Sequence, residues 1–363
     1  MDIAQIDENF KLPLPNGETD IEWLNANQAP FDLRGVFYSE EEKLYRRLPK
    51  DVADATSAGV AGLSKYTAGG RVRFITNSPY VAIKCVIPAN LPMNHMPLSG
   101  SHGFTIYADG KFAGFFPPNI ADVAKATSGT IAFQGIRYFP LHLLQDMCIY
   151  FPLYNGVFEL YIGVKKGSTV QTPTPYPMEK PVVFYGSSIT QGGCASRPGN
   201  DYAALLSRKF HFDFINLGFS GNGKGEQIMA DYIAGLHPAV FVLDYDHNAP
   251  SVEHLQQTHY NMYYTFRKEN PNAPVVMVSK PDFDNDPNAA KRRAVIYETY
   301  AKAKKNGDKL VYFVDGEKLF ETDGRDGCTV DGCHPNDLGF YRMAKNIMPT
   351  LKTALKKAYK KNK

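Results

Sequence analysis

The first half of the chain places short hydrophobic runs between turn-forming residues. From about residue 20 to residue 166, β-branched and aromatic side chains gather in strand-like segments, as at 71–76, 80–87 and 157–164. An Asp-Gly pair at Asp109 and Gly110 interrupts another such segment, which is the favoured signal of a tight type I′ hairpin. Many short strands at near-regular spacing predict an all-β sandwich of jelly-roll type.

The second half has a different pattern, in which apolar strands alternate with segments of helical period. The expected strands cover residues 181–185, 213–216, 239–244, 274–278 and 310–314. The expected helices cover residues 201–210, 225–235, 252–270, 287–306 and 336–359. This alternation predicts βαβ units around a parallel sheet, whose ligands lie at the carboxyl ends of the strands.

A stiff segment separates the two patterns. Residues 167–177 contain three alternate prolines, which favour an extended connector between domains. We therefore predict an N-terminal β-sandwich domain over residues 1–170 and an α/β domain over residues 171–363. Because ligand pockets are common between domains, we expect the sandwich to contribute to the pocket.

Composition narrows the classes of partner. The chain is 44% hydrophobic and 21% charged, which is typical of a globular protein. No apolar run approaches the ~18 residues of a membrane-spanning helix, and 40 basic against 37 acidic residues favour neither nucleic acid nor an anionic membrane as partner. The first eight residues lack the features of a signal peptide. We expect a secreted or periplasmic protein whose leader is absent from this sequence, with a cytoplasmic protein as the alternative.

The five cysteines are scattered and form no CxxC pair, so they predict neither a disulfide scaffold nor a zinc site. In an oxidising compartment Cys194 and Cys333 can pair, with Cys328 as a competing partner. Free buried thiols are the simpler expectation.

Two loops after the first two predicted strands can carry chemistry. Ser188 follows a buried strand and a glycine turn, where a hydroxyl can project above the sheet beside the amide donors of a helix start. An ordinary turn or helix cap is the alternative. The glycine-rich loop 217–223 follows the second strand, and its backbone amides can approach a small anion, although a flexible turn explains it equally well.

Two later segments complete the set. Asn248 ends the polar run 244–248, where its amide can donate to a developing oxyanion. In the same run, Asp244, Asp246 and His247 could bind a metal, but their spacing fits no compact site. Asp331 and His334 lie three residues apart before a helix, so the carboxylate can hold the imidazole while Nε2 faces a serine.

In this order, the four segments resemble the SGNH (GDSL) hydrolase superfamily over residues 180–358. The resemblance implies an α/β/α fold of flavodoxin-like type with a five-stranded parallel sheet. It implies a triad of Ser188, His334 and Asp331, and an oxyanion hole made by Ser188, Gly221 and Asn248. Neither a metal nor another cofactor is implied.

The sequence of residues 188–199 and 216–222 resembles that of a bacterial two-domain branch of this superfamily, whose members carry a β-sandwich ahead of the hydrolase domain. Residues 31–49 fit the start of that appended domain. This branch includes carbohydrate acetylesterases, so the expected substrates are acyl esters, above all acetyl esters, of carbohydrates. Arg197, Asp201 and Asn222 are candidate substrate contacts, with capping and loop roles as the alternative.

Two departures from the family pattern keep other functions open. Ser187 stands where the family has aspartate, and the third segment reads Asp-Tyr-Asp-His-Asn in place of Gly-x-Asn-Asp. A catalytically dead carbohydrate-binding protein is therefore one alternative. A lipase-type or thioesterase-type acylhydrolase with the same triad is the other.

Overall fold

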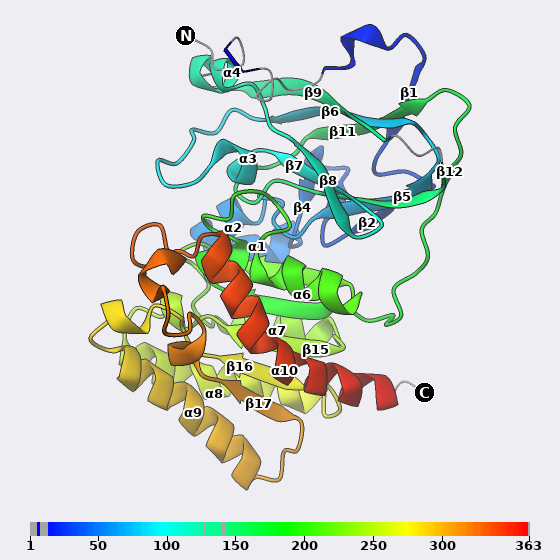
Figure 1. Ribbon diagram of the computed structural model, residues 1–363. Coiled ribbons are helices and arrows are strands. Elements are labelled where there is room, and N and C mark those ends of the chain that lie inside the picture. Colours follow the sequence, from blue (N-terminus) through cyan, green and yellow to red (C-terminus); the bar gives the residue numbers. More distant parts are fainter. Residues whose placement is uncertain (1–5, 8–13, 127, 140–142, 362–363) are drawn as a thin grey trace.

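The computed structural model describes residues 6–7, 14–126, 128–139 and 143–361. Most of the first eight residues, in which the sequence analysis finds no signal-peptide features, lie outside this range. A strand-rich N-terminal domain packs against a C-terminal domain of strands and helices (Figure 1). The structure thereby confirms the predicted two-domain fold.

The N-terminal domain is built from two antiparallel sheets. The first has the strand order β1 (Ile21–Asn25), β11 (Glu159–Lys165), β6 (Tyr80–Pro88) and β9 (Thr130–Tyr138). The second has the order β12 (Val170–Gln171), β5 (Arg71–Thr76), β10 (Gln145–Tyr150), β7 (Phe104–Ala108) and β8 (Lys111–Phe116), with β2 (Asp32–Arg34) also paired to β5. A separate hairpin joins β3 (Phe37–Ser39) to β4 (Leu44–Arg46).

Short helices complete this domain. They are η3 (Pro15–Gly17), α1 (Lys50–Thr56), α2 (Ala58–Leu63), α3 (Leu98–Ser101) and α4 (Ile120–Lys125). Side chains that alternate along the strands, such as Phe74, Ile83 and Ile149, fill one apolar core. The predicted hairpin joins β7 to β8, and both Asp109 (φ 48°) and Gly110 (φ 75°) adopt the left-handed conformation that a type I′ turn requires.

The C-terminal domain contains a parallel five-stranded sheet. Its order is β14 (Phe214–Gly218), β13 (Val182–Gly186), β15 (Val240–Asp244), β16 (Val275–Val278) and β17 (Val311–Val314). The helices are α5 (Ser188–Gln191), α6 (Tyr202–Phe210), α7 (Gln227–Gly235), α8 (Val252–Glu269), α9 (Ala289–Lys305) and α10 (Asp337–Lys361). Short 3₁₀ turns are η4 (Asp246–Asn248), η5 (Phe283–Asn285), η6 (Gly316–Lys318) and η7 (Arg325–Cys328).

Both faces of this sheet are covered, which explains why its strands are almost wholly apolar. Phe184 and Val242 face the core shared with α6 and α10, whereas Tyr185 and Phe241 face the core shared with α7, α8 and α9 (Figure 1). The first strand of the domain lies between the second and the third, so the strand order reverses at β13. Such a reversal opens a crevice at the carboxyl ends of the strands, where ligands bind.

Buried arginines of the N-terminal domain fix it to β14. Arg47 is only 2% exposed, and its guanidinium donates to Asn216 O at 3.0 Å and to Gly218 O at 2.7 Å. Arg71 donates to Phe214 O at 3.1 Å and forms a buried ion pair with Asp213. The sandwich therefore supports the strand from which the glycine-rich loop leaves.

Within the described residues, no helix combines the length and the apolar character needed to cross a lipid bilayer.

Candidate active site

The Ser188 turn lies at the carboxyl end of β13. Glycine is required at Gly186, because a Cβ there would lie 2.1 Å from Thr190 Oγ1 and 2.3 Å from Asp244 O. Ser187 caps α5 by accepting a hydrogen bond from Ile189 N at 3.1 Å. Ser188 is the first residue of α5, and its N–H has no acceptor among the described residues. The turn thus places a hydroxyl and a free amide donor side by side.

His334 and Asp331 meet this serine from the loop before α10. Ser188 Oγ lies 2.9 Å from His334 Nε2, and His334 Nδ1 lies 2.7 Å from Asp331 Oδ2. The other carboxylate oxygen accepts from the His334 and Cys333 backbone amides at 2.7 and 3.1 Å. The structure therefore joins the three predicted residues in one continuous chain of hydrogen bonds, although 146 residues separate Ser188 from His334.

The surroundings set the charges of this chain. Burial would raise the pKa of Asp331, but hydrogen bonds from the His334 backbone and ring lower it to about 2. The Cys333 side chain, followed by Asp331, raises the pKa of His334 to about 9 against the effect of burial. The site thus favours a carboxylate at Asp331 and stabilises a positive charge on the imidazole, which is the charge that appears when a serine gives up its proton.

The glycine-rich loop folds back over the Ser188 turn. Phe219 N donates to Gly186 O at 2.9 Å, and Phe219 O accepts from Asn248 Nδ2 at 2.8 Å. Gly221 has φ 68°, a Cβ placed on it would meet nothing within 4 Å, and its N–H has no acceptor in the described part of the chain. Asn248, at the end of η4, thus holds the loop through one amide hydrogen and keeps the other for a further acceptor.

The candidate substrate contacts have roles within the protein. The Arg197 guanidinium lies 4.2 Å from the ring centre of Phe112 in β8, and Asp201 caps α6 by accepting from Ala204 N at 2.9 Å. Asn222 donates to Ser220 O at 2.7 Å, and its Oδ1 lies so close to Gly59 of α2 that a Cβ there would be 2.0 Å away. These contacts fit the loop and capping alternatives.

Asp244 and His247, at the polar end of β15, make contacts within the protein. Asp244 Oδ2 accepts from Tyr202 OH at 2.7 Å and from Thr190 Oγ1 at 3.1 Å, which ties α5 and α6 to the sheet. The His247 ring contacts other residues: its Nε2 lies 2.9 Å from Cys333 Sγ and its Nδ1 lies 3.3 Å from Asp282 Oδ1. Among the described residues, Asp244, Asp246 and His247 therefore form no common set of metal ligands.

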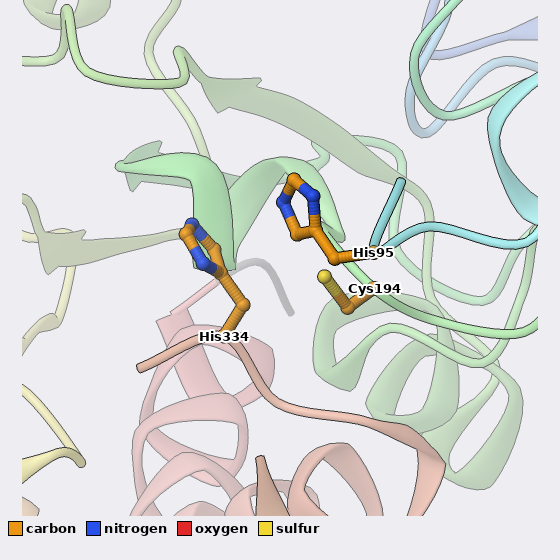
Figure 2. Close-up of side chains that lie close together, drawn as sticks. All are labelled: His95, Cys194 and His334. Atoms are coloured by element: carbon orange, nitrogen blue, oxygen red, sulfur yellow. The ribbon is translucent and has the colours of Figure 1, made fainter. Parts of the chain in front are cut away.

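Two residues of the N-terminal domain reach the site and were not predicted. Tyr154 OH donates to Ser188 O at 3.1 Å, and the centre of the His95 ring lies 5.7 Å from that of His334 (Figure 2). Both lie in loops of the sandwich, where no local pattern marks them. All five cysteines are free, so the Cys194–Cys333 pair considered from the sequence is not formed.

Two family models match the chain, one in each domain. Residues 179–352 match the model of the GDSL-like lipase/acylhydrolase family, and residues 21–170 match the N-terminal domain of esterases of SGNH-hydrolase type. No protein with a curated description matches the chain.

Solved structures share both domains. A GDSL-like lipase from Bacteroides ovatus, described as putative, is 29% identical with a TM-score of 0.80, over 93% of this chain and 98% of its own. The salicylyl-acyltransferase SsfX3 from a tetracycline biosynthetic pathway is 19% identical with a TM-score of 0.75, over 93% of this chain and 99% of its own. An acetyl xylan esterase from Butyrivibrio proteoclasticus is 14% identical with a TM-score of 0.59, over 93% and 100%.

Proposed function

Since this chain is a carboxylic-ester hydrolase of the GDSL-like lipase/acylhydrolase family, we propose that it removes acetyl groups from carbohydrates, with Ser188 as its nucleophile. The hydrogen-bond chain from Ser188 through His334 to Asp331 carries this proposal. The choice of a carbohydrate acetate draws on the acetyl xylan esterase that has the same two-domain layout.

In the acylation step, His334 Nε2 takes the hydroxyl proton as Ser188 Oγ attacks the acetyl carbon. Negative charge then collects on the former carbonyl oxygen. The Ser188 N–H, the Gly221 N–H and the free amide hydrogen of Asn248 are its proposed donors. His334 next gives its proton to the sugar oxygen, the ester C–O bond breaks, and the carbohydrate alcohol leaves.

In the deacylation step, water replaces the sugar. His334 takes a proton from the water, whose oxygen attacks the acetyl-serine carbon, and then returns a proton to Ser188 Oγ as acetate leaves. Asp331 stabilises the imidazolium in both steps through its 2.7 Å contact with Nδ1. The cycle needs only side chains, backbone amides and water.

Acetate release from acetylated xylan and from an aryl acetate tests the proposal. We expect the wild type to release acetate from both substrates and Ser188→Ala to release none above background. Ser39→Ala is the matched control, because Ser39 lies in the β3–β4 hairpin of the sandwich, where its hydroxyl accepts from Glu42 N at 3.3 Å, and the change should affect turnover little. Hydrolysis of the aryl acetate alone would contradict the carbohydrate substrate. Turnover that survives Ser188→Ala would contradict the nucleophile, and no turnover by the wild type would favour the binding-protein alternative.

A further inference from the structure

His334 lies beside His95 and Cys194, whose side chains are of types that can bind soft metal ions. Possible ligand atoms of His95, Cys194 and His334 all lie within 4.8 Å of one another. Figure 2 shows the two imidazole rings next to each other and the Cys194 sulfur pointing toward the same place. The three residues come from a loop of the sandwich, from the segment after α5 and from the loop before α10, so only the folded two-domain chain brings them together.

Among the described residues, neither His95 nor Cys194 uses its side chain in a hydrogen bond. Cys194 is only 3% exposed. The backbone of Cys194 is left-handed, with φ 73°, a conformation that a residue with a Cβ rarely adopts. A buried thiol is thus held in a strained position beside the triad histidine, and strain of this kind is often kept at functional sites.

We propose that His95, Cys194 and His334 bind Zn²⁺, or a divalent cation of similar affinity for sulfur, and that this cation switches the esterase off. Two imidazole nitrogens and one thiolate are a typical donor set for zinc, with a fourth position left open. Binding would release the thiol proton of Cys194, as zinc does at other cysteine ligands. The switching part of this inference rests on the proposed function, whereas the binding part does not.

The orientation of His334 decides which nitrogen would bind. Asp331 occupies Nδ1 at 2.7 Å, so Nε2 would be the ligand and would give up its 2.9 Å contact with Ser188 Oγ. A carboxylate behind a histidine is the usual support of a zinc-bound imidazole. The Cδ2 atom, next to Nε2, faces the Cys194 loop, since a Cβ on Gly193 would lie 3.4 Å from it. A cation on Nε2 removes the base that Ser188 needs, so acylation stops.

Two other sets of possible ligands lie nearby and share Cys333. They are His247, Asp282 and Cys333, and Asp331, Cys333 and His334. In both sets the donors already contact each other, because Cys333 Sγ lies 2.9 Å from His247 Nε2 and Asp331 holds His334. A cation there must break these hydrogen bonds within the ligand set, whereas a cation at the site with His95 and Cys194 displaces the Ser188 Oγ–His334 Nε2 contact and leaves Asp331 on Nδ1, which favours that site. Cys333→Ser is therefore the matched control for Cys194→Ser.

The binding test uses Co²⁺ as a spectroscopic probe in place of Zn²⁺. We expect the metal-free full-length protein to develop thiolate-to-cobalt charge-transfer absorbance, which zinc then removes by displacement. Cys194→Ser should lose this absorbance and Cys333→Ser should keep it. His95→Ala should weaken cobalt binding by about tenfold or more. Because the His95 side chain is exposed, this variant tests the site even if Cys194→Ser fails to fold.

The activity test measures zinc inhibition of aryl acetate hydrolysis, with each variant compared with its own zinc-free rate. We expect EDTA to restore the wild type, and His95→Ala and Cys194→Ser to need about tenfold more zinc or more for half inhibition. Mg²⁺, which prefers oxygen ligands, should not inhibit.

Three results would overturn the inference: no cobalt–thiolate absorbance in the wild type, absorbance that follows Cys333 instead of Cys194, or equal zinc inhibition of wild type, His95→Ala and Cys194→Ser. Failure of the proposed function gives a different result. If aryl acetate hydrolysis survives Ser188→Ala while cobalt binding still depends on Cys194, the metal site stands and the switch falls.

Discussion

Asp331 is held by three hydrogen bonds from its own loop, namely those of the His334 ring, the His334 amide and the Cys333 amide. This carboxylate therefore fixes both the tautomer of His334 and its place beside Ser188. Its contribution to the reaction can be separated from its contribution to loop shape, because asparagine keeps an oxygen acceptor for the two amides.

Asp331→Asn should lower kcat for aryl acetate by about a thousandfold or more, because the imidazolium loses its counter-charge and the imidazole its correct tautomer. Thermal unfolding should change little. The measurement is kcat together with the melting temperature, and an Asp331→Asn enzyme of near-normal kcat would remove this residue from the mechanism.

Asn248→Ala should lower kcat by about a hundredfold or more with a smaller effect on KM, since one donor to the transition-state oxyanion is lost. Asn222→Ala is the matched control, because the Asn222 amide is turned toward Ser220 O. Steady-state kinetics of both variants, giving kcat and KM for aryl acetate, test this role of Asn248. Equal losses in the two would mean that Asn248 acts only by holding the loop.

The three residues that the structure joins by hydrogen bonds could be predicted from sequence because each follows a recognisable strand or precedes a recognisable helix. Ser188 comes after the apolar segment of β13, and Asp331 and His334 come before α10. His95 and Tyr154 could not be predicted in this way. Their place at the site depends on how the two domains pack, and that packing leaves no local periodicity in their loops.

At the scale of elements, the α/β half was predicted closely and the sandwich only in part. The five parallel strands are buried on both faces, so each is a continuous apolar run that stands out between polar helices. Strand β10 begins with Gln145 and Asp146 and strand β9 is partly exposed, so neither gives a clear apolar pattern, and neither was predicted. Helices α1 and α2 are too short to show a helical period.

The link between α5, α6 and β15 should make stability depend on pH. Burial raises the pKa of Asp244 to about 7, well above the ordinary range of an aspartate. A carboxyl group whose pKa is raised by folding stabilises the fold while it is protonated, so its contribution is complete below about pH 4 and is lost as pH rises toward 7.

Asp244→Asn should therefore flatten the decline of the melting temperature between about pH 4 and pH 7. Asp246, whose pKa burial raises to about 6, should keep part of that decline in the variant. Melting temperatures across this range test the idea. A variant with the same pH slope as the wild type would show that Asp244 is charged in the folded protein.

At the scale of the whole molecule, Arg47 couples folding of the two domains. Besides the two carbonyls of β14, it donates to Leu63 O and Tyr66 O at 2.8 and 2.6 Å. Burial lowers the pKa of Arg47 to about 9. Four carbonyl oxygens, two from each domain, accept hydrogen bonds from its guanidinium.

Arg47→Ala should destabilise the protein by about 3 kcal/mol or more, because it leaves buried carbonyl groups without a donor. It should also lower kcat, since the loop with Gly221 leaves from the end of β14. Arg34→Ala is the control, because Arg34 is half-exposed and its ion pair with Asp213 should contribute about 1 kcal/mol or less. Denaturant unfolding and aryl acetate kinetics measure both effects, and equal losses in the two variants would contradict the assignment.

The Arg47 contacts also limit how this architecture can be recombined. A chimera that joins residues 171–363 to a foreign sandwich must supply a donor for Asn216 O and Gly218 O, and a residue no larger than glycine opposite Asn222. Without both, we expect the grafted protein to lose the shape of its glycine-rich loop even if each half folds. Domain exchange in this chain should therefore succeed only with sandwiches that keep this arginine and this gap.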